Sequence, residues 1–193
     1  MAYPTRSALL VSDMYGRHGD VAYMDQWSAA LVRTGLTTKI VYMDDLLPEL
    51  YLCSGSAAEL HTSLVTSQVW SLAVLRLEEK IAQWQTDLLI GFSYGGYVSF
   101  GARKALAQNS TLMCISTTRL RDCLPITSLP TIYAFFGDQD PHRPQNLGNV
   151  LKGASFYDET VIHGHGHDLY RDISSCLPPV LEKLKAHRRS RIA

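Results

Sequence analysis

The chain alternates short apolar runs with longer segments of helical periodicity, and this alternation limits the folds that it can adopt. Most of the runs are apolar at consecutive positions, as in strands that are buried on both faces of a parallel sheet. The last run alternates more, as an edge strand does. Strands are therefore predicted over residues 7–12, 37–43, 86–92, 110–116, 129–137 and 154–162.

The segments between these runs place apolar residues at helical spacing. In the first of them Trp27, Ala30 and Leu31 share one face, and Gly35 suits the end of a helix. The segment 44–59 is the least regular, and we predict a long loop near the mouth of the sheet. Strands that alternate with helices indicate a doubly wound α/β sandwich with right-handed crossovers. Helices are predicted over residues 23–34, 63–85, 94–108 and 172–187.

Composition argues for one domain with its own core. The 193 residues are 46% hydrophobic, which is enough to bury a full core in one unit. No repeat or break in composition marks a second domain. We therefore predict a single domain over residues 1–187, followed by a basic C-terminal tail, 188–193, with the sequence RRSRIA.

The net charge of the chain and the length of its apolar stretches limit the binding partners and the cellular location that we expect. Lys+Arg and Asp+Glu are both 18, so electrostatics gives no reason to expect nucleic acid or an anionic membrane as a partner. The apolar run Ala8–Val11 is too short for the core of a signal peptide, and no stretch is long enough to span a bilayer. The four cysteines lack CxxC spacing, and Cys114 within LMCIS suits a buried reduced thiol. By default, we expect a soluble cytoplasmic protein.

The stretch LLIGFSYGGY carries the first chemical signal. Gly91, Ser93 and Gly95 form G-x-S-x-G between a predicted buried strand and a predicted helix. A strand that turns at once into a helix strains the corner residue and presents its hydroxyl. Small neighbouring residues let the helix approach the strand closely, and the helix N-terminus offers free N–H groups to an oxyanion. The alternative interpretation is an ordinary glycine-rich turn.

A candidate acid and a candidate base follow two later strands. Asp138 and Asp140 come after TIYAFF, in GDQDPH, and three histidines lie in HGHGHDLY after FYDETVI. Functional groups of a parallel sheet gather at the carboxyl ends of its strands. A serine nucleophile needs a base, and the base needs an orienting acid. Serine, aspartate and histidine occur here in the chain order typical of α/β-hydrolases. The histidines are His163, His165 and His167.

The elbow GFSYGG, the acid turn FFGDQDP and the histidine turn GHGHDL together resemble the α/β-hydrolase superfamily over nearly the whole chain. The resemblance implies six mainly parallel strands in the order 2-1-3-4-5-6, without the two N-terminal strands of the full fold. It selects Asp140, the last position of a G-x-x-D turn, and His167, which follows a glycine and precedes the final helix. His165 also follows a glycine and is the nearest competitor for the base.

VSDMYG and the spacing from serine to acid are similar to dienelactone-hydrolase-like proteins, which often use cysteine where this chain has Ser93. That resemblance implies an oxyanion hole made by the backbone N–H groups of Met14 and Tyr94. It also places Asp13 beside the site, where substrate binding and a role as loop residue or helix cap are equal alternatives. Tyr15 could line the pocket. The segment 117–130 is short for an inserted lid, so we expect a small, lidless member with an open site.

Three hypotheses for function follow. The first is a serine hydrolase that cleaves a small carboxylic ester or thioester through Ser93, His167 and Asp140, without cofactor or metal. The second is a non-hydrolytic protein of the same fold, either a small-molecule binder or scaffold or a lyase or cyclase. The third is a metal hydrolase built on the alternating histidines, which would share one side of an extended strand. The glycines between these histidines favour a catalytic loop over the metal site.

Overall fold

The structure is a computed structural model that describes residues 6–66, 69–120, 130–144 and 157–189. Six parallel strands form one sheet in the order β2-β1-β3-β4-β5-β6. This confirms the predicted topology, and all of the strand pairs are parallel. The strands are β1 (Ser7–Val11), β2 (Thr37–Val41), β3 (Leu88–Phe92), β4 (Thr111–Ile115), β5 (Thr131–Gly137) and β6 (Tyr157–Ile162).

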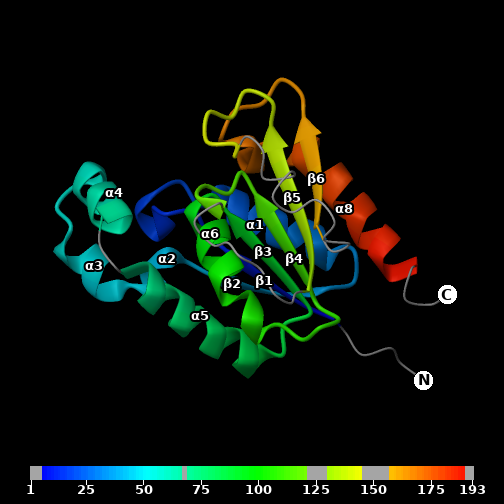
Figure 1. The fold of residues 1–193 in the computed structure, drawn as a ribbon, viewed down its shortest axis with the longest axis horizontal. Coiled ribbons are helices and arrows are strands. Elements are labelled where there is room, and N and C mark those ends of the chain that lie inside the picture. Colours follow the sequence, from blue (N-terminus) through cyan, green and yellow to red (C-terminus); the bar gives the residue numbers. More distant parts are fainter. Residues whose placement is uncertain (1–5, 67–68, 121–129, 145–156, 190–193) are drawn as a thin grey trace.

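Helices cover both faces of the sheet, which gives three layers (Figure 1). One face packs against α1 and α8, and the other packs against α5, α6 and the short helices before α5. The helices are α1 (Ala22–Val32), α2 (Met43–Leu46), α3 (Pro48–Cys53), α4 (Ala57–Thr66), α5 (Val69–Trp84), α6 (Tyr94–Gly101) and α8 (Ile173–Arg189), with 3₁₀ turns at Gly16–His18, Ala102–Ala105 and Leu169–Arg171.

Side-chain alternation along the strands divides the core between these faces. Leu9 and Val11 of β1 belong to the core on the α5 and α6 side, whereas Ala8 and Leu10 belong to the core beneath α1 and α8. Strands β3 and β4 are buried at every position, as their continuous apolar runs predict. The edge strands β2 and β6 are more exposed, which confirms the edge position predicted for the last run.

The prediction of a long loop over residues 44–59 is wrong. Most of this segment forms α2 and α3, and α4 begins at Ala57. Pro48 opens α3, where its fixed φ and missing N–H suit the first helical turn. Burial of Met43, Leu46 and Tyr51 holds these short helices against the core. Tertiary packing therefore stabilises helices that are too short to show a clear periodicity in sequence.

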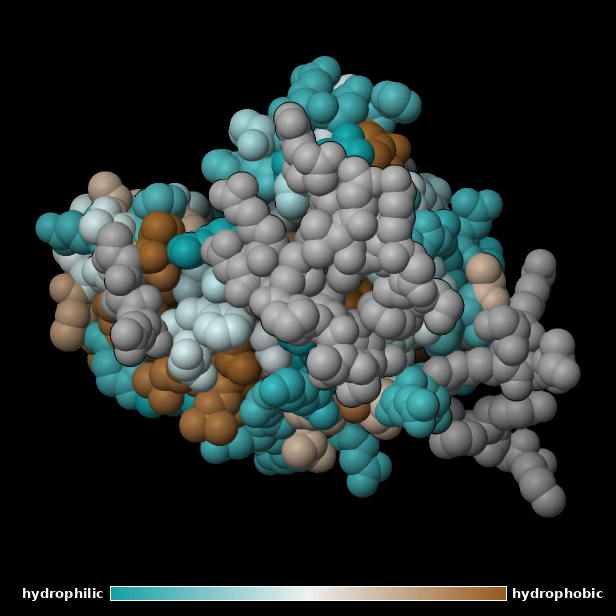
Figure 2. All heavy atoms as spheres, in the orientation of Figure 1, coloured by the Kyte–Doolittle hydropathy of each residue, from teal (hydrophilic) through white to brown (hydrophobic). Residues whose placement is uncertain are grey.

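The end of the molecule formed by α3, α4 and α5 also carries exposed apolar side chains. Figure 2 shows brown patches over this end, which lies at the left and lower left of Figure 1. The large apolar residues exposed on these three helices are Leu52, Val65, Leu72 and Leu75.

No helix in the described part of the chain is long and apolar enough to cross a membrane.

Candidate active site

Ser93 stands at the corner between β3 and α6. Its backbone has φ +51° and ψ −118°, a strained conformation for a residue with a side chain. The glycines around it are required by close packing. A Cβ at Gly91 would lie 2.5 Å from Gly96 Cα, and a Cβ at Gly95 would lie 2.0 Å from the carbonyl oxygen of Ser12. The G-x-S-x-G spacing therefore brings α6 directly onto the strands, and this contact holds Ser93 at the carboxyl edge of the sheet.

The structure brings Ser93, His167 and Asp140 into one hydrogen-bonded line. Ser93 Oγ lies 2.8 Å from His167 Nε2, and His167 Nδ1 lies 3.0 Å from Asp140 Oδ2. Because an ionised carboxylate can only accept, Nδ1 carries the proton and Nε2 is free to accept from the serine hydroxyl. The Asp140 side chain is fully buried, whereas the His167 side chain is 27% exposed. This tautomer is the one that a general base at Nε2 requires.

The acid turn and the histidine loop are joined by backbone contacts. The N–H of Gln139 donates to the carbonyl of His165, and Asp138 Oδ1 accepts the N–H of Gly164 at 2.8 Å. A Cβ at Gly137 would lie 2.1 Å from the same His165 carbonyl oxygen, so only glycine allows this approach. Asp140 and His167 therefore belong to two loops that are fixed against each other.

Each histidine of HGHGH faces a different carboxylate. His163 pairs with Asp138 at 3.0 Å, His165 lies 3.9 Å from Asp172, and only His167 reaches Ser93. Within the described residues, no group of three or more histidine, cysteine, aspartate or glutamate side chains is arranged to hold a metal ion. The arrangement gives no support to a metal site built on the three alternating histidines.

The two residues whose N–H groups are expected at an oxyanion hole lie at the start of α6, for Tyr94, and in the turn after β1, for Met14. Tyr94 is the first residue of α6, so its N–H is among those that lack a partner within the helix. Its buried hydroxyl donates to the carbonyl of Leu64 at 3.2 Å, and burial raises the Tyr94 pKa to about 12. Met14 lies in the turn after β1, and its carbonyl accepts the hydroxyl of Tyr51.

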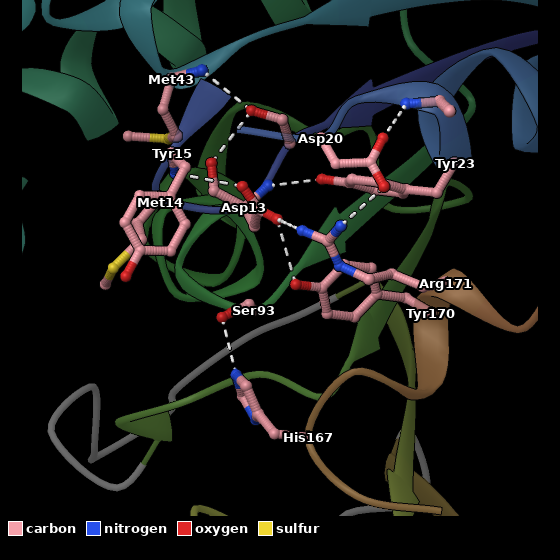
Figure 3. Close-up of polar contacts among 12 residues, drawn as sticks. Asp13, Met14, Tyr15, Asp20, Tyr23, Met43, Ser93, His167, Tyr170 and Arg171 are labelled. Carbon is pink, nitrogen blue, oxygen red and sulfur yellow. Dashed lines mark hydrogen bonds and ion pairs between the residues drawn. The ribbon is translucent and has the colours of Figure 1, made fainter. Parts of the chain in front are cut away.

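Asp13 is buried in a polar cluster beside Ser93 (Figure 3). Its Oδ1 accepts the N–H of Tyr15, and its Oδ2 accepts from Tyr170 Oη and from Arg171 Nη2, each at 3.0 Å. The side chain is only 4% exposed. Both carboxylate oxygens of Asp13 therefore have protein partners. The bond to the N–H of Tyr15 is local to the loop that precedes the 3₁₀ turn Gly16–His18.

Tyr15 forms part of a cavity of about 220 Å³ next to the turn after β1. Tyr51 and His18 contribute two further rings, with their centroids 5.4 Å apart. The start of α4 lines one side of the cavity, and Leu60 lies one turn before Leu64, whose carbonyl accepts the Tyr94 hydroxyl. The lining residues are Tyr15, His18, Tyr51, Ser54, Gly55, Ser56, Ala57 and Leu60.

Sequence reasoning gave no role in the site to several residues that lie around it. Arg171 and Tyr170 bind Asp13 from a turn that is far away in the chain. His142 packs edge-on against His167, with ring centroids 4.9 Å apart, and its N–H donates to Asp140. The only sequence signal for these residues is that they follow His167 or Asp140 by two to four positions.

Most of the segment 117–130, which the sequence predicted to be too short for a lid, lies outside the described residues.

Comparisons with known proteins were made for the sequence and for the structure. No protein-family model and no curated protein matches the sequence. Solved structures match throughout most of the chain. A candidate dienelactone hydrolase from Klebsiella pneumoniae subsp. pneumoniae is 13% identical, with a TM-score of 0.63 over 88% of this chain and 78% of that one.

Two further structures give the same result. A candidate α/β-superfamily hydrolase from Xanthomonas campestris pv. campestris is 16% identical, with a TM-score of 0.63 over 94% of this chain and 99% of that one. An α/β serine hydrolase homologue from Coxiella burnetii is 17% identical, with a TM-score of 0.57 over 95% and 84%. At these identities the likeness establishes the fold. The chain has the α/β-hydrolase fold, as the sequence motifs predicted.

Proposed function

We propose that this protein is a serine hydrolase that cleaves a small carboxylic ester or thioester through an acyl-enzyme. The observation that carries the proposal is the line from Ser93 Oγ to His167 Nε2, at 2.8 Å, and from His167 Nδ1 to the buried Asp140 carboxylate. Serine hydrolases require a nucleophile, a base within hydrogen-bond reach and an acid that sets the tautomer of the base. The fold shared with known and candidate hydrolases agrees with this chemistry.

The reaction begins with attack of Ser93 Oγ on the substrate carbonyl carbon while His167 Nε2 takes the hydroxyl proton. The negative charge that develops on the carbonyl oxygen would be met by the N–H groups of Tyr94 and Met14. The tetrahedral intermediate then collapses, and the alcohol or thiol leaves with the proton from His167. Water attacks the resulting acyl-serine, its proton passes to His167, and Ser93 is restored when the acid product departs.

The cavity beside Tyr15 is the proposed place for the part of the substrate beyond the reacting carbonyl. It is continuous with the turn that carries Met14, since Tyr15 is the next residue and Tyr51 bonds the Met14 carbonyl. Among the described residues that line it there is no carboxylate or guanidinium, so a neutral group fits better than an acidic one. Ala57→Trp should narrow the cavity and raise KM for long-chain esters while acetyl esters are unaffected. Equal KM changes for both substrates would contradict this placement.

Hydrolysis of a panel of p-nitrophenyl esters and acyl thioesters tests the proposed activity. The wild-type protein should release p-nitrophenol with a burst that equals the protein concentration if deacylation is slow. Ser93→Ala should be inactive and fold normally, because it keeps the backbone and removes one oxygen. A folded wild-type protein without turnover of any substrate in the panel, or a Ser93→Ala variant with full turnover, would overturn the proposal.

A further inference from the structure

The polar cluster around Asp13 connects two parts of the site that are distant in sequence. Asp13 immediately precedes Met14 in the turn after β1, and Arg171 ends the 3₁₀ turn that follows His167. Arg171 Nη2 lies 3.0 Å from Asp13 Oδ2, across 158 positions of sequence. Figure 3 shows this pair and Tyr170 beside the Ser93–His167 contact. One ion pair, between the partly exposed Arg171 and the buried Asp13, thus joins the turn of the expected oxyanion hole to the loop of the expected base.

The cluster holds the backbone next to Met14 from both sides. The N–H of Asp13 donates to Tyr23 Oη at 2.9 Å, and the N–H of Tyr15 donates to Asp13 Oδ1 at 3.0 Å. Burial, together with the negative charge of Asp13, raises the pKa values of Tyr23 and Tyr170 well above the usual range. Their hydroxyls therefore remain protonated, and Tyr170 remains a donor to Asp13.

The cluster is also anchored in the core beneath α1. Trp27 Nε1 donates to the carbonyl of Tyr170 at 2.8 Å, and the Tyr170 ring lies 4.9 Å from the Tyr23 ring. Arg171 Nη1 reaches a second carboxylate, Asp20, at 3.2 Å. The two carboxylates differ in burial, because the Asp20 side chain is 69% exposed and that of Asp13 is 4% exposed. Water therefore screens the interaction of Arg171 with Asp13 less than its interaction with Asp20.

We propose that Asp13 and Arg171 are positioning residues that keep the N–H of Met14 in register with His167. The proposal rests on the proposed hydrolase function. Neither side chain touches the serine–histidine–aspartate line in the contacts described, so each acts through its neighbours. The oxyanion N–H must meet charge that exists only in the transition state, and misplacement by about 1 Å can cost about 100-fold in rate.

Asp13→Asn and Arg171→Gln test this coupling. The Asn oxygen can still accept the N–H of Tyr15, but its amide cannot pair with the guanidinium. Both variants should lose on the order of 10- to 100-fold in kcat, with KM within about twofold, because the loss appears in the transition state. Arg171→Lys should recover part of the loss. The double variant should be no slower than the slower single variant, because both remove the same connection.

Asp20→Asn is the matched control, because it removes the exposed carboxylate partner of the same guanidinium. Its kcat should equal that of the wild type. A boronic acid adds a second readout, since Ser93 Oγ adds to boron and the tetrahedral adduct needs the oxyanion hole. Its affinity should fall with kcat in Asp13→Asn and Arg171→Gln and stay unchanged in Asp20→Asn.

Several outcomes would overturn the positioning role. These are unchanged kcat in folded Asp13→Asn, an equal loss in Asp20→Asn, or additive losses in the double variant. If Asp13→Asn does not fold, the comparison of Arg171→Gln with Arg171→Lys decides, since both leave the end of β1 intact. Wild-type turnover of esters with failure of these predictions would reject the positioning role alone. Absence of wild-type turnover would instead reject the proposed function.

Discussion

Two histidine–aspartate pairs lie at the same edge of the sheet, and their geometry is similar. The distance from Nδ1 to the nearest matching carboxylate oxygen is 3.0 Å in both His167–Asp140 and His163–Asp138. Their surroundings differ. The Asp140 and His167 side chains are 0% and 27% exposed, whereas those of Asp138 and His163 are 33% and 90% exposed. Only His167 has a serine hydroxyl on its other nitrogen.

This difference shows that the distance within such a pair does not reveal its role. A carboxylate removed from water interacts strongly with a charge that forms on the imidazole, and an exposed pair is screened. The Asp138 pair is instead suited to holding the histidine loop, because Asp138 also accepts the N–H of Gly164. We therefore expect the buried pair to control the reaction and the exposed pair to contribute to the stability of the loop.

Removal of the base should have the largest effect on activity. His167→Ala leaves Ser93 without a proton acceptor, and loss of the base in a serine hydrolase can lower kcat by about 10⁶-fold. His165→Ala is the matched control two positions away and should keep most of the activity, because His165 faces Asp172 instead of Ser93. Steady-state hydrolysis of a p-nitrophenyl ester measures both. An inactive His165→Ala together with an active His167→Ala would show that His165, and not His167, is the base.

Loss of the buried acid should have the next largest effect. Asp140→Asn cannot accept from Nδ1–H as a charged group, so His167 loses its preferred tautomer and kcat should fall by about 10⁴-fold. The same substitution at Asp138 provides the comparison, and kcat of the two variants should differ by orders of magnitude. Equal losses at the two positions, or a larger loss at Asp138, would contradict the division of roles.

The exposed pair should show its effect in the pH dependence of stability and only slightly in rate. Asp138→Asn should keep kcat within a few-fold of the wild type. The contacts of Asp138 with His163 and Gly164 lower its pKa below the usual range. A lowered carboxyl pKa stabilises the folded state above the unfolded pKa of about 4, and this contribution disappears as pH falls through the folded value.

Denaturant unfolding of wild type and Asp138→Asn between pH 2 and pH 6 measures this contribution. The difference in unfolding free energy should be largest at pH 6 and should shrink as the pH falls below about 4. A difference that grows on acidification would mean that the charged form of Asp138 does not stabilise the loop.

The sequence predicted the sheet because its central strands are buried on both faces. Continuous apolar runs such as those around Leu89 and Met113 have few other environments in a chain of this size, and the strand order is the one that the resemblance to α/β-hydrolases implied. Helices α2 and α3 could not be predicted in the same way. They have four and six residues, too few for a periodic pattern, and they depend on packing of residues such as Leu46 and Tyr51.

For the site, the sequence could predict residues at strand ends but not the contacts between loops. Ser93, Asp140 and His167 each follow a strand of the parallel sheet, so topology alone brings them to one edge. The pairing of Asp13 with Arg171 depends on the paths of two turns that are 158 positions apart. No local sequence pattern predicts which of the nearby polar groups a buried carboxylate will contact.

Mass spectrometry of the protein after treatment with a fluorophosphonate tests the central claim most directly, because the reagent reacts with a serine that is activated as a nucleophile. We expect one adduct per chain on the wild type, mapped to the peptide that contains Ser93, and no adduct on a folded Ser93→Ala variant. A folded wild-type protein that takes up no label, or an adduct that persists in Ser93→Ala, would contradict the assignment of Ser93 as the nucleophile.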